Sequence, residues 1–90
     1  DLIENMPTVK LFASLRKLAG TKELSVPGAT IGAVLDELVI RNPALNGMLL
    51  EEGKVRPHVL LTVNGHSTTE IHTQVAEQDV LAIFPPIAGG

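Results

Sequence analysis

The stretch PGATIGAVLDELVIRNP, residues 27–43, predicts the main helix of the chain. Thr30 suits the N-cap position, because its hydroxyl can accept a hydrogen bond from an amide of the first helical turn. Pro43 is expected to end the helix, since proline lacks the amide that would continue the hydrogen-bonding pattern. Between these two residues the apolar side chains recur at helical spacing and would form one buried face: Ile31, Val34, Leu35 and Leu38.

Short apolar runs on both sides of this helix predict strands. Two strands are expected before the helix, at residues 9–12 and 23–26, with a helical turn or compact loop at 14–20 between them. After the helix, Leu45, Met48, Leu49 and Leu50 suggest a further helical turn, and Glu51 to Lys54 a loop. Asn64-Gly65 favours a hairpin turn between strands at 58–64 and 66–69. Residues 80–84 predict a last, buried strand.

The order β-β-α-β-β predicts an α+β fold of the β-grasp type: a mixed sheet of four to five strands with one main helix across one face. We expect the domain to span residues 6–84 and residues 85–90 to form a flexible tail. Met6-Pro7-Thr8 is typical of a natural start. Residues 1–5 are therefore expected to be tag residues or a disordered extension.

The composition disfavours several classes of function. The 90 residues include no cysteine, so neither disulfides nor thiol catalysis is expected. The net charge is −3, and the chain has no tryptophan or tyrosine on which bases could stack, which argues against nucleic-acid binding. No apolar run is long enough to cross a membrane. We therefore expect a soluble, cytoplasmic protein.

The C-terminal residues have properties that suit a reactive tail. Pro85 and Pro86 cannot continue a central strand and stiffen the chain that leaves it. Gly89 and Gly90 have no side chains and can pass through a narrow channel. A tail of residues 85–90, including Ile87 and Ala88, would reach about 20 Å. The Gly90 carboxylate is a poor electrophile and would need activation. The sequence holds no phosphate-binding motif, so another protein would have to supply it.

Four segments resemble the small subunit of molybdopterin synthase, the MoaD type of the MoaD/ThiS sulfur carriers: residues 11–20, 28–32, 63–65 and 84–90. The similarity extends over most of residues 8–90. It implies a ubiquitin-like sulfur carrier rather than an enzyme. By this resemblance, a ubiquitin-activating-type enzyme adenylates Gly90 with ATP and sulfur is installed as a thiocarboxylate. A synthase such as the large subunit of molybdopterin synthase then receives the sulfur. The activating partner uses the ATP, and no cofactor is bound permanently.

Other assignments stay open at this point. Residues 53–58 are also similar to carriers of cysteine biosynthesis, the CysO type, and thiamin carriers of the ThiS type share the terminal diglycine. Archaeal ubiquitin-like modifiers share it as well, and in them Gly90 would be joined to lysines of target proteins. A β-grasp interaction domain without tail chemistry is a further alternative.

Strand alternation predicts which residues face a partner. One set of alternating positions is wholly aliphatic and is assigned to the core: Val9, Leu11, Val59, Leu61, Val63, Leu81 and Ile83. The other set is assigned to the open face as a partner docking surface: Phe12, Leu60, Thr62, Ala82 and Phe84. A β-bulge would reverse this assignment.

Other polar residues are expected to be ordinary surface residues. His58, His66 and His72 lack the spacing of a metal site, so no metal is expected. Asp36 and Glu37 are adjacent on the helix and do not face each other. Neither pattern predicts catalysis.

Overall fold

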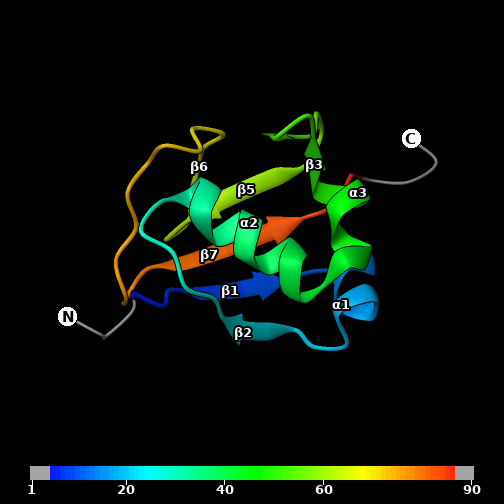
Figure 1. The fold of residues 1–90 in the computed structure, drawn as a ribbon, viewed down its shortest axis with the longest axis horizontal. Coiled ribbons are helices and arrows are strands. Elements are labelled where there is room, and N and C mark those ends of the chain that lie inside the picture. Colours follow the sequence, from blue (N-terminus) through cyan, green and yellow to red (C-terminus); the bar gives the residue numbers. More distant parts are fainter. Residues whose placement is uncertain (1–4, 87–90) are drawn as a thin grey trace.

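The structure, a computed structural model, describes residues 5–86 and contains one five-stranded sheet in the order β2-β1-β7-β5-β6 (Figure 1). Strand β1 pairs in parallel with β7, and the other pairs are antiparallel. The sheet is therefore mixed. The bounds of its strands are β1 Thr8–Leu11, β2 Glu23–Ser25, β5 Leu60–Val63, β6 His66–Ser67 and β7 Val80–Phe84.

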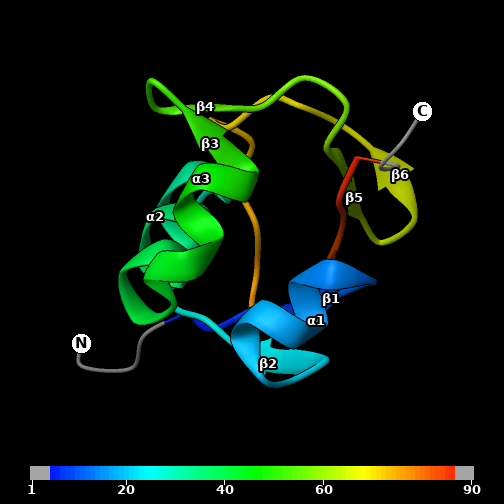
Figure 2. The same ribbon diagram turned by 90° about the vertical axis from the view of Figure 1, so that its right-hand side faces the viewer.

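The helices lie on one side of the sheet. Helix α2, Ile31–Arg41, crosses one face, and the 3₁₀ helix η1, Pro43–Leu45, and α3, Asn46–Leu49, continue this layer. Figure 2 shows the strands from one end, with α2 and α3 to the left of the sheet and α1, Ser14–Ala19, at the near end beside β1. The predicted β-grasp arrangement is confirmed. Within residues 5–86, no helix is long and apolar enough to cross a membrane.

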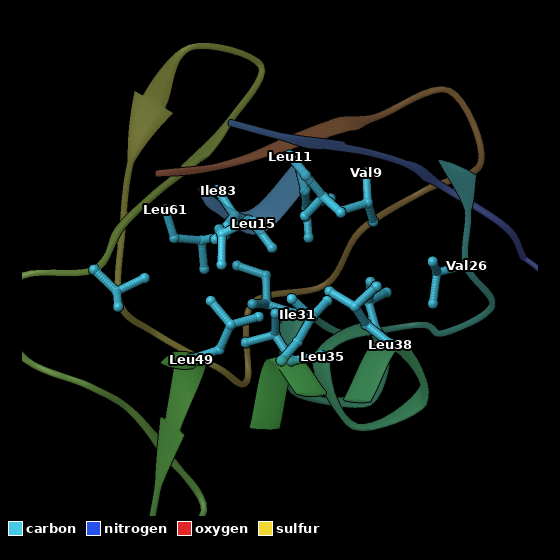
Figure 3. Packing of buried hydrophobic residues seen from close by; sticks show 14 of the residues in the cluster. Val9, Leu11, Leu15, Val26, Ile31, Leu35, Leu38, Leu49, Leu61 and Ile83 are labelled. Atoms are coloured by element: carbon cyan, nitrogen blue, oxygen red, sulfur yellow. The ribbon is translucent and has the colours of Figure 1, made fainter. Parts of the chain in front are cut away.

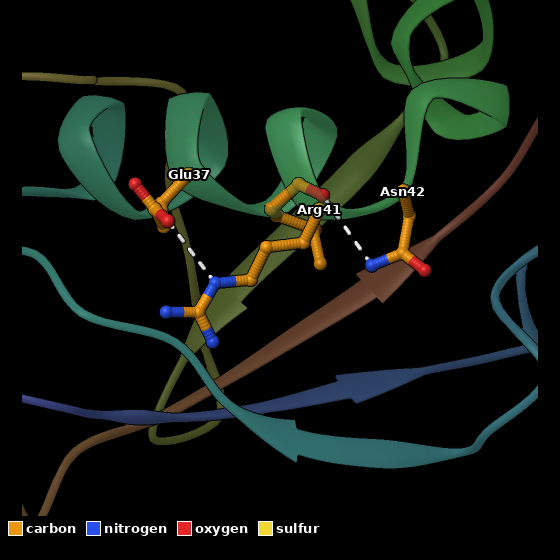
Figure 4. Close-up of polar contacts among 4 residues, drawn as sticks. Glu37, Arg41 and Asn42 are labelled. Atoms are coloured by element: carbon orange, nitrogen blue, oxygen red, sulfur yellow. Dashed lines mark hydrogen bonds and ion pairs between the residues drawn. The ribbon is translucent and has the colours of Figure 1, made fainter.

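Both ends of α2 are closed by local hydrogen bonds. The Thr30 hydroxyl accepts from the Ala33 amide at 3.1 Å, as predicted for an N-cap. At the other end the Arg41 guanidinium pairs with Glu37 at 3.0 Å, and the Asn42 side chain donates to the Leu38 carbonyl at 3.4 Å (Figure 4). The Thr30 and Asn42 side chains thus each pair with a backbone group near one end of the helix that covers the core.

The core lies between the sheet and the helices (Figure 3). Leu11, Leu61 and Ile83 point from the strands toward Leu35 and Leu49 of the helices. The predicted core face is buried as expected in six of seven positions. Val63 is only partly buried, because it precedes the exposed hairpin turn at Asn64-Gly65.

Two details differ from the sequence prediction. A small hairpin of β3, Leu50–Glu51, and β4, Lys54–Val55, replaces the predicted loop. Asn5 also belongs to the folded domain, although the boundary was placed at Met6. Its side-chain amide donates to the carbonyls of Gly28, at 2.9 Å, and Val75, at 2.8 Å. The hydrogen bonds thus fix the chain one residue earlier than Met6.

Candidate functional site

The parallel pairing of β1 and β7 brings both phenylalanines of the chain together. Leu11 is in register with Ile83, so the residues that follow, Phe12 and Phe84, are neighbours at the same end of the sheet. Their rings stack with centroids 4.3 Å apart and planes inclined by 14°. Sequence alternation placed the two residues on one face, but the stacking depends on the strand pairing.

Strand β5 completes a surface that we call the open-face patch, made of Phe12, Leu60, Thr62, Ala82 and Phe84. Leu60 is in register with Phe84, and Thr62 with Ala82. Leu60 is 47% exposed, and the other four residues are partly buried. The structure therefore brings together all five residues that strand alternation assigned to this face. That a partner docks here stays a prediction.

Arg16 forms a cationic rim at the patch. Its Nε donates to the Leu11 carbonyl at 2.8 Å, and its guanidinium carbon lies 5.1 Å from the centre of the Phe12 ring. Ala13, with a φ of 55°, makes the turn that starts α1 and places Arg16 beside Phe12. From the sequence alone, Arg16 could serve either as a charged contact for an acceptor protein or as an ordinary solubility charge. Phe12 lies before the start of α1, so no helical spacing in the sequence marks this pair.

The tail leaves the sheet directly at this patch. Pro85 is partly buried and Pro86 is exposed, immediately after Phe84 at the end of β7. The remaining tail residues predicted to thread a partner, Ile87, Ala88 and Gly89, and the attachment residue Gly90 lie outside the described residues. Their roles stay predictions.

A shallow hollow adjoins the patch on the far side of Leu60. It has a volume of about 290 Å³ and is lined by two short segments, residues 59–61 of β5 and residues 67–69 after β6. Two of the three residues on the second segment are threonines and the third is Ser67. The hollow therefore offers hydroxyl groups beside an apolar wall.

At the opposite end of the sheet, where β7 begins, polar contacts connect the loops. The Asp79 carboxylate accepts from the Ala76 amide at 2.8 Å and from the Asn64 side chain at 2.9 Å. These hydrogen bonds, the one from Ala76 first, hold the pKa of Asp79 below its ordinary value. The Asn64 side chain in turn accepts from the Val80 amide at 3.0 Å. This network joins the hairpin turn to the start of β7.

The chemistry of the patch suits binding. Its residues offer apolar contact and aromatic stacking, and Arg16 and the exposed Lys10 offer positive charge at its border. Among residues 5–86, no three metal-ligating side chains of the His, Cys, Asp and Glu types gather in one place.

Comparison with known proteins places this geometry in a family. The family model described as "ThiS family" matches residues 9–90. Small archaeal modifier protein 3 of Haloferax volcanii is 34% identical over 91% of this chain and 96% of its own length. The molybdopterin synthase sulfur carrier subunit of Arabidopsis thaliana is 40% identical over 91% of this chain and 80% of its own length.

A solved structure agrees with the sequence matches. The solution structure of small archaeal modifier protein 1 from Methanosarcina acetivorans superposes with a TM-score of 0.86 at 31% identity, over 98% of this chain and 99% of that one. With a family match over most of its residues and relatives of matching length and fold, the chain belongs to the ThiS family of small β-grasp sulfur carriers and ubiquitin-like modifiers.

Proposed function

We propose that this chain is a sulfur carrier that works through the carboxylate of Gly90. The observation that carries the proposal is the position of the open-face patch at the point where Phe84 leads into Pro85. A partner that covers the patch is thereby placed to receive the tail. The family match, which extends to residue 90, supports the diglycine as the working end.

The patch and the tail are expected to make opposite contributions to the free energy of binding. Ordering residues 87–90 in a channel costs roughly 4–8 kcal/mol of backbone entropy. Burying Phe12, Leu60 and Phe84 contributes at most about 1.5–3 kcal/mol for each side chain, and less where the side chain is already partly covered. The two quantities are comparable. The patch can therefore offset the ordering of a tail that would bind weakly alone.

The proposed chemistry takes place on partner proteins. A ubiquitin-activating-type enzyme joins the Gly90 carboxylate to the AMP part of ATP and releases pyrophosphate. Hydrosulfide from a sulfur donor then attacks the Gly90 carbonyl carbon and loses its proton, and AMP leaves with the electrons of the broken carbon–oxygen bond. The product is a thiocarboxylate, which the acceptor synthase uses as its sulfur source. The chain itself is not the enzyme, and the ATP is bound by the activating partner.

We assign the sulfur to molybdopterin biosynthesis, with the large subunit of molybdopterin synthase as acceptor. The 40% identity to a carrier subunit of that synthase supports this choice. A CysO-like or ThiS-like role in cysteine or thiamin biosynthesis is the alternative within the same chemistry.

A second candidate function is protein modification, in which Gly90 is conjugated to lysines of other proteins. The observation that favours it is the 34% identity to a small archaeal modifier protein over nearly the whole of both chains. Both functions begin with activation of Gly90 and differ in the nucleophile that receives it.

The product on Gly90 separates the two candidates. The protein is incubated with ATP, a sulfur donor and cell extract of its source, and then with a thiol-directed alkylating reagent. Because the chain has no cysteine, a thiocarboxylate is the one group expected to react strongly. Fragmentation must place the label on Gly90, since oxidation of Met6 or Met48 adds nearly the same mass as the exchange of oxygen for sulfur.

We expect ATP-dependent label at Gly90. Conjugates of higher mass without free label would favour the modifier. A variant that lacks Gly89 and Gly90 is the matched control, because its patch is unchanged. If this variant behaves as the wild type in both assays, the tail carries no chemistry and the proposal is wrong.

A further inference from the structure

The basic residues of the chain are unevenly distributed. Residues 8–25 contain four basic residues and one acidic residue, a net charge of +3, although the net charge of the whole chain is −3. Residues 26–86 contain three basic and seven acidic residues, a net charge of −4. The four basic residues of the first segment are all exposed, and we call them the basic flank: Lys10, Arg16, Lys17 and Lys22.

One member of the basic flank, Lys10, lies on the open face of the sheet. Its neighbours Val9 and Leu11 are buried under the helices, so the Lys10 side chain points to the opposite face. Lys10 is in register with Ala82 of the open-face patch. On its other side it is in register with Glu23, the one acidic residue of the segment. Positive charge therefore adjoins the patch along β1.

The other three members gather at the end of β1, around Phe12. The Arg16 guanidinium carbon lies 5.1 Å from the centre of the Phe12 ring, and Lys17 is the next residue of α1. The Lys22 carbonyl accepts from the Leu11 amide at 2.9 Å, which holds the main chain of Lys22 beside the last residue of β1 (Figure 1). The basic flank thus borders the patch at the end of the sheet where the tail leaves.

Within residues 5–86 the basic flank has no carboxylate partner at ion-pair distance. The ion pairs in this part of the chain join Arg41 to Glu37 at 3.0 Å and Arg56 to Glu51 at 4.0 Å. Apart from Glu23, the acidic residues described lie on α2, on the β3–β4 hairpin and between β6 and β7: Asp36, Glu37, Glu51, Glu52, Glu70, Glu77 and Asp79. The flank is therefore a positive surface that another molecule can neutralise.

The surroundings of the flank favour an acidic protein surface over a nucleic acid. An apolar patch adjoins the flank, and a phosphate backbone would leave its exposed residue Leu60 without an apolar contact. The chain has no tryptophan or tyrosine on which a base could stack. Phe12 and Phe84 stack on each other at 4.3 Å, so each ring already has one face covered. A protein that offers both apolar and acidic side chains fits this combination.

We propose that the adenylating enzyme presents acidic side chains to the basic flank and that this attraction accelerates association. The inference rests on the proposed function for the existence of the partner, and it adds the sign of the partner's charge and the kinetic step that the charge controls. Opposite charges at a solvated rim raise the rate of encounter more than they slow dissociation. Salt screens such an attraction, with a Debye length of about 8 Å at physiological ionic strength.

A matched pair of charge reversals, Lys22→Glu and Lys54→Glu, tests the proposal on the full chain. Both lysines are exposed and both variants change the net charge equally, but Lys54 lies on β4, outside the basic flank. Association with the purified adenylating enzyme of the source organism is followed by stopped-flow mixing at low salt. We expect Lys22→Glu to associate at least fivefold more slowly than the wild type and Lys54→Glu to stay within twofold. Equal association rates would overturn the inference.

A second position guards against a local effect of one substitution. Lys17→Glu reverses another exposed charge of the flank and should also slow association at least fivefold, with a dissociation rate within about twofold of the wild type. Circular dichroism checks that the variants are folded. If Lys17→Glu associates as fast as Lys54→Glu, the flank does not steer the enzyme and the inference is wrong.

The salt dependence and a nucleic-acid probe give two further measurements. The wild-type association rate should fall at least tenfold between about 0.02 M and 0.5 M NaCl, and the dependence should be shallower for Lys22→Glu. A rate that does not change with salt would contradict the inference. A labelled single-stranded RNA should bind at least a hundredfold more weakly than the enzyme. If it binds as tightly and Lys22→Glu abolishes this binding, the flank serves nucleic acid instead.

The two proposals fail in different ways. If the wild-type chain shows no ATP-dependent change at Gly90, the proposed function is wrong. If Gly90 is labelled while Lys22→Glu and Lys54→Glu associate at the same rate, the function stands and the charge proposal alone is wrong.

Discussion

Leu60 and Leu61 are the same residue type at consecutive positions of β5, yet they serve opposite faces of the sheet. Leu61 is 1% exposed and packs under helix α2 and its neighbours, whereas Leu60 is 47% exposed on the face without helices. The same alternation recurs in β7, where Ile83 is buried and Phe84 is partly open. Leu60 and Leu61 have the same side chain at adjacent positions. They differ only in whether helices cover their face of the sheet.

The comparison indicates which apolar residues serve folding and which serve binding. Burial of apolar area supplies folding free energy only where a covering layer removes water. The covered face has this layer and the open face does not. Apolar side chains such as Phe84 and Leu60 on the open face therefore contribute less to folding than their size suggests. Their position beside the tail agrees with a role in docking.

The largest effect is expected for Leu61→Ala against Leu60→Ala. Removing the buried side chain leaves a cavity and should lower the free energy of unfolding by about 2–5 kcal/mol. Leu60→Ala should lower the free energy of unfolding by less than about 1 kcal/mol. Urea denaturation of both variants measures the difference. Equal losses would show that the open face is covered in the free protein, which would contradict the comparison.

Phe84→Ala should separate binding from folding. We expect a loss of about thirtyfold or more in affinity for the adenylating enzyme, the size typical of an aromatic residue at the centre of an interface. The domain should remain folded, although loss of the stacking with Phe12 removes about 0.5–1.5 kcal/mol beyond the area term. Isothermal titration and urea denaturation measure the two quantities. Normal binding by the folded variant would show that the docking surface lies elsewhere.

Arg16→Gln should have a smaller effect at the border of the patch. The change removes a cation–π contact with Phe12, a contact worth about 0.5–1 kcal/mol at exposed sites, and the hydrogen bond to Leu11. Lys17→Gln makes the same change of charge at the next, exposed position. The unfolding free energy should fall more for Arg16→Gln than for Lys17→Gln. Equal losses would mean that Arg16 acts only through its charge.

The sequence was sufficient to predict the layers of the fold, because alternation in strands and helical spacing report directly on burial. Val9, Leu81 and Ile31, all chosen in this way, are fully buried. The small hairpin of β3 and β4 was missed, since strands of two residues are too short to show alternation. The patch could be predicted for the same reason as the core, as the complementary set of positions.

Contacts that depend on pairing between distant strands could not be predicted. The stacking of Phe12 on Phe84 requires the parallel register of β1 and β7, which no local pattern encodes. The network of Asn64 and Asp79 joins residues 15 positions apart in two loops.

The smallest effect is expected at the opposite end of the sheet, where polar contacts replace the apolar patch. Because hydrogen bonds lower the pKa of Asp79 in the folded state, its ionised form stabilises the fold above the unfolded-state pKa of about 3.9. This contribution should be lost as the pH falls through the lower, folded-state pKa. Asp79→Asn should therefore flatten the acid limb of a plot of unfolding free energy against pH.

The control for this prediction is Asp36→Asn, an identical change on the exposed side of helix α2. Denaturant unfolding between about pH 2 and pH 6 measures both variants against the wild type. If the acid limb is the same for Asp79→Asn and Asp36→Asn, the network does not hold the loops together through its charge. Acid should leave the stacked rings of the open-face patch unaffected, since neither ring titrates. If only Asp79→Asn flattens the acid limb, different interactions stabilise the two ends of the sheet.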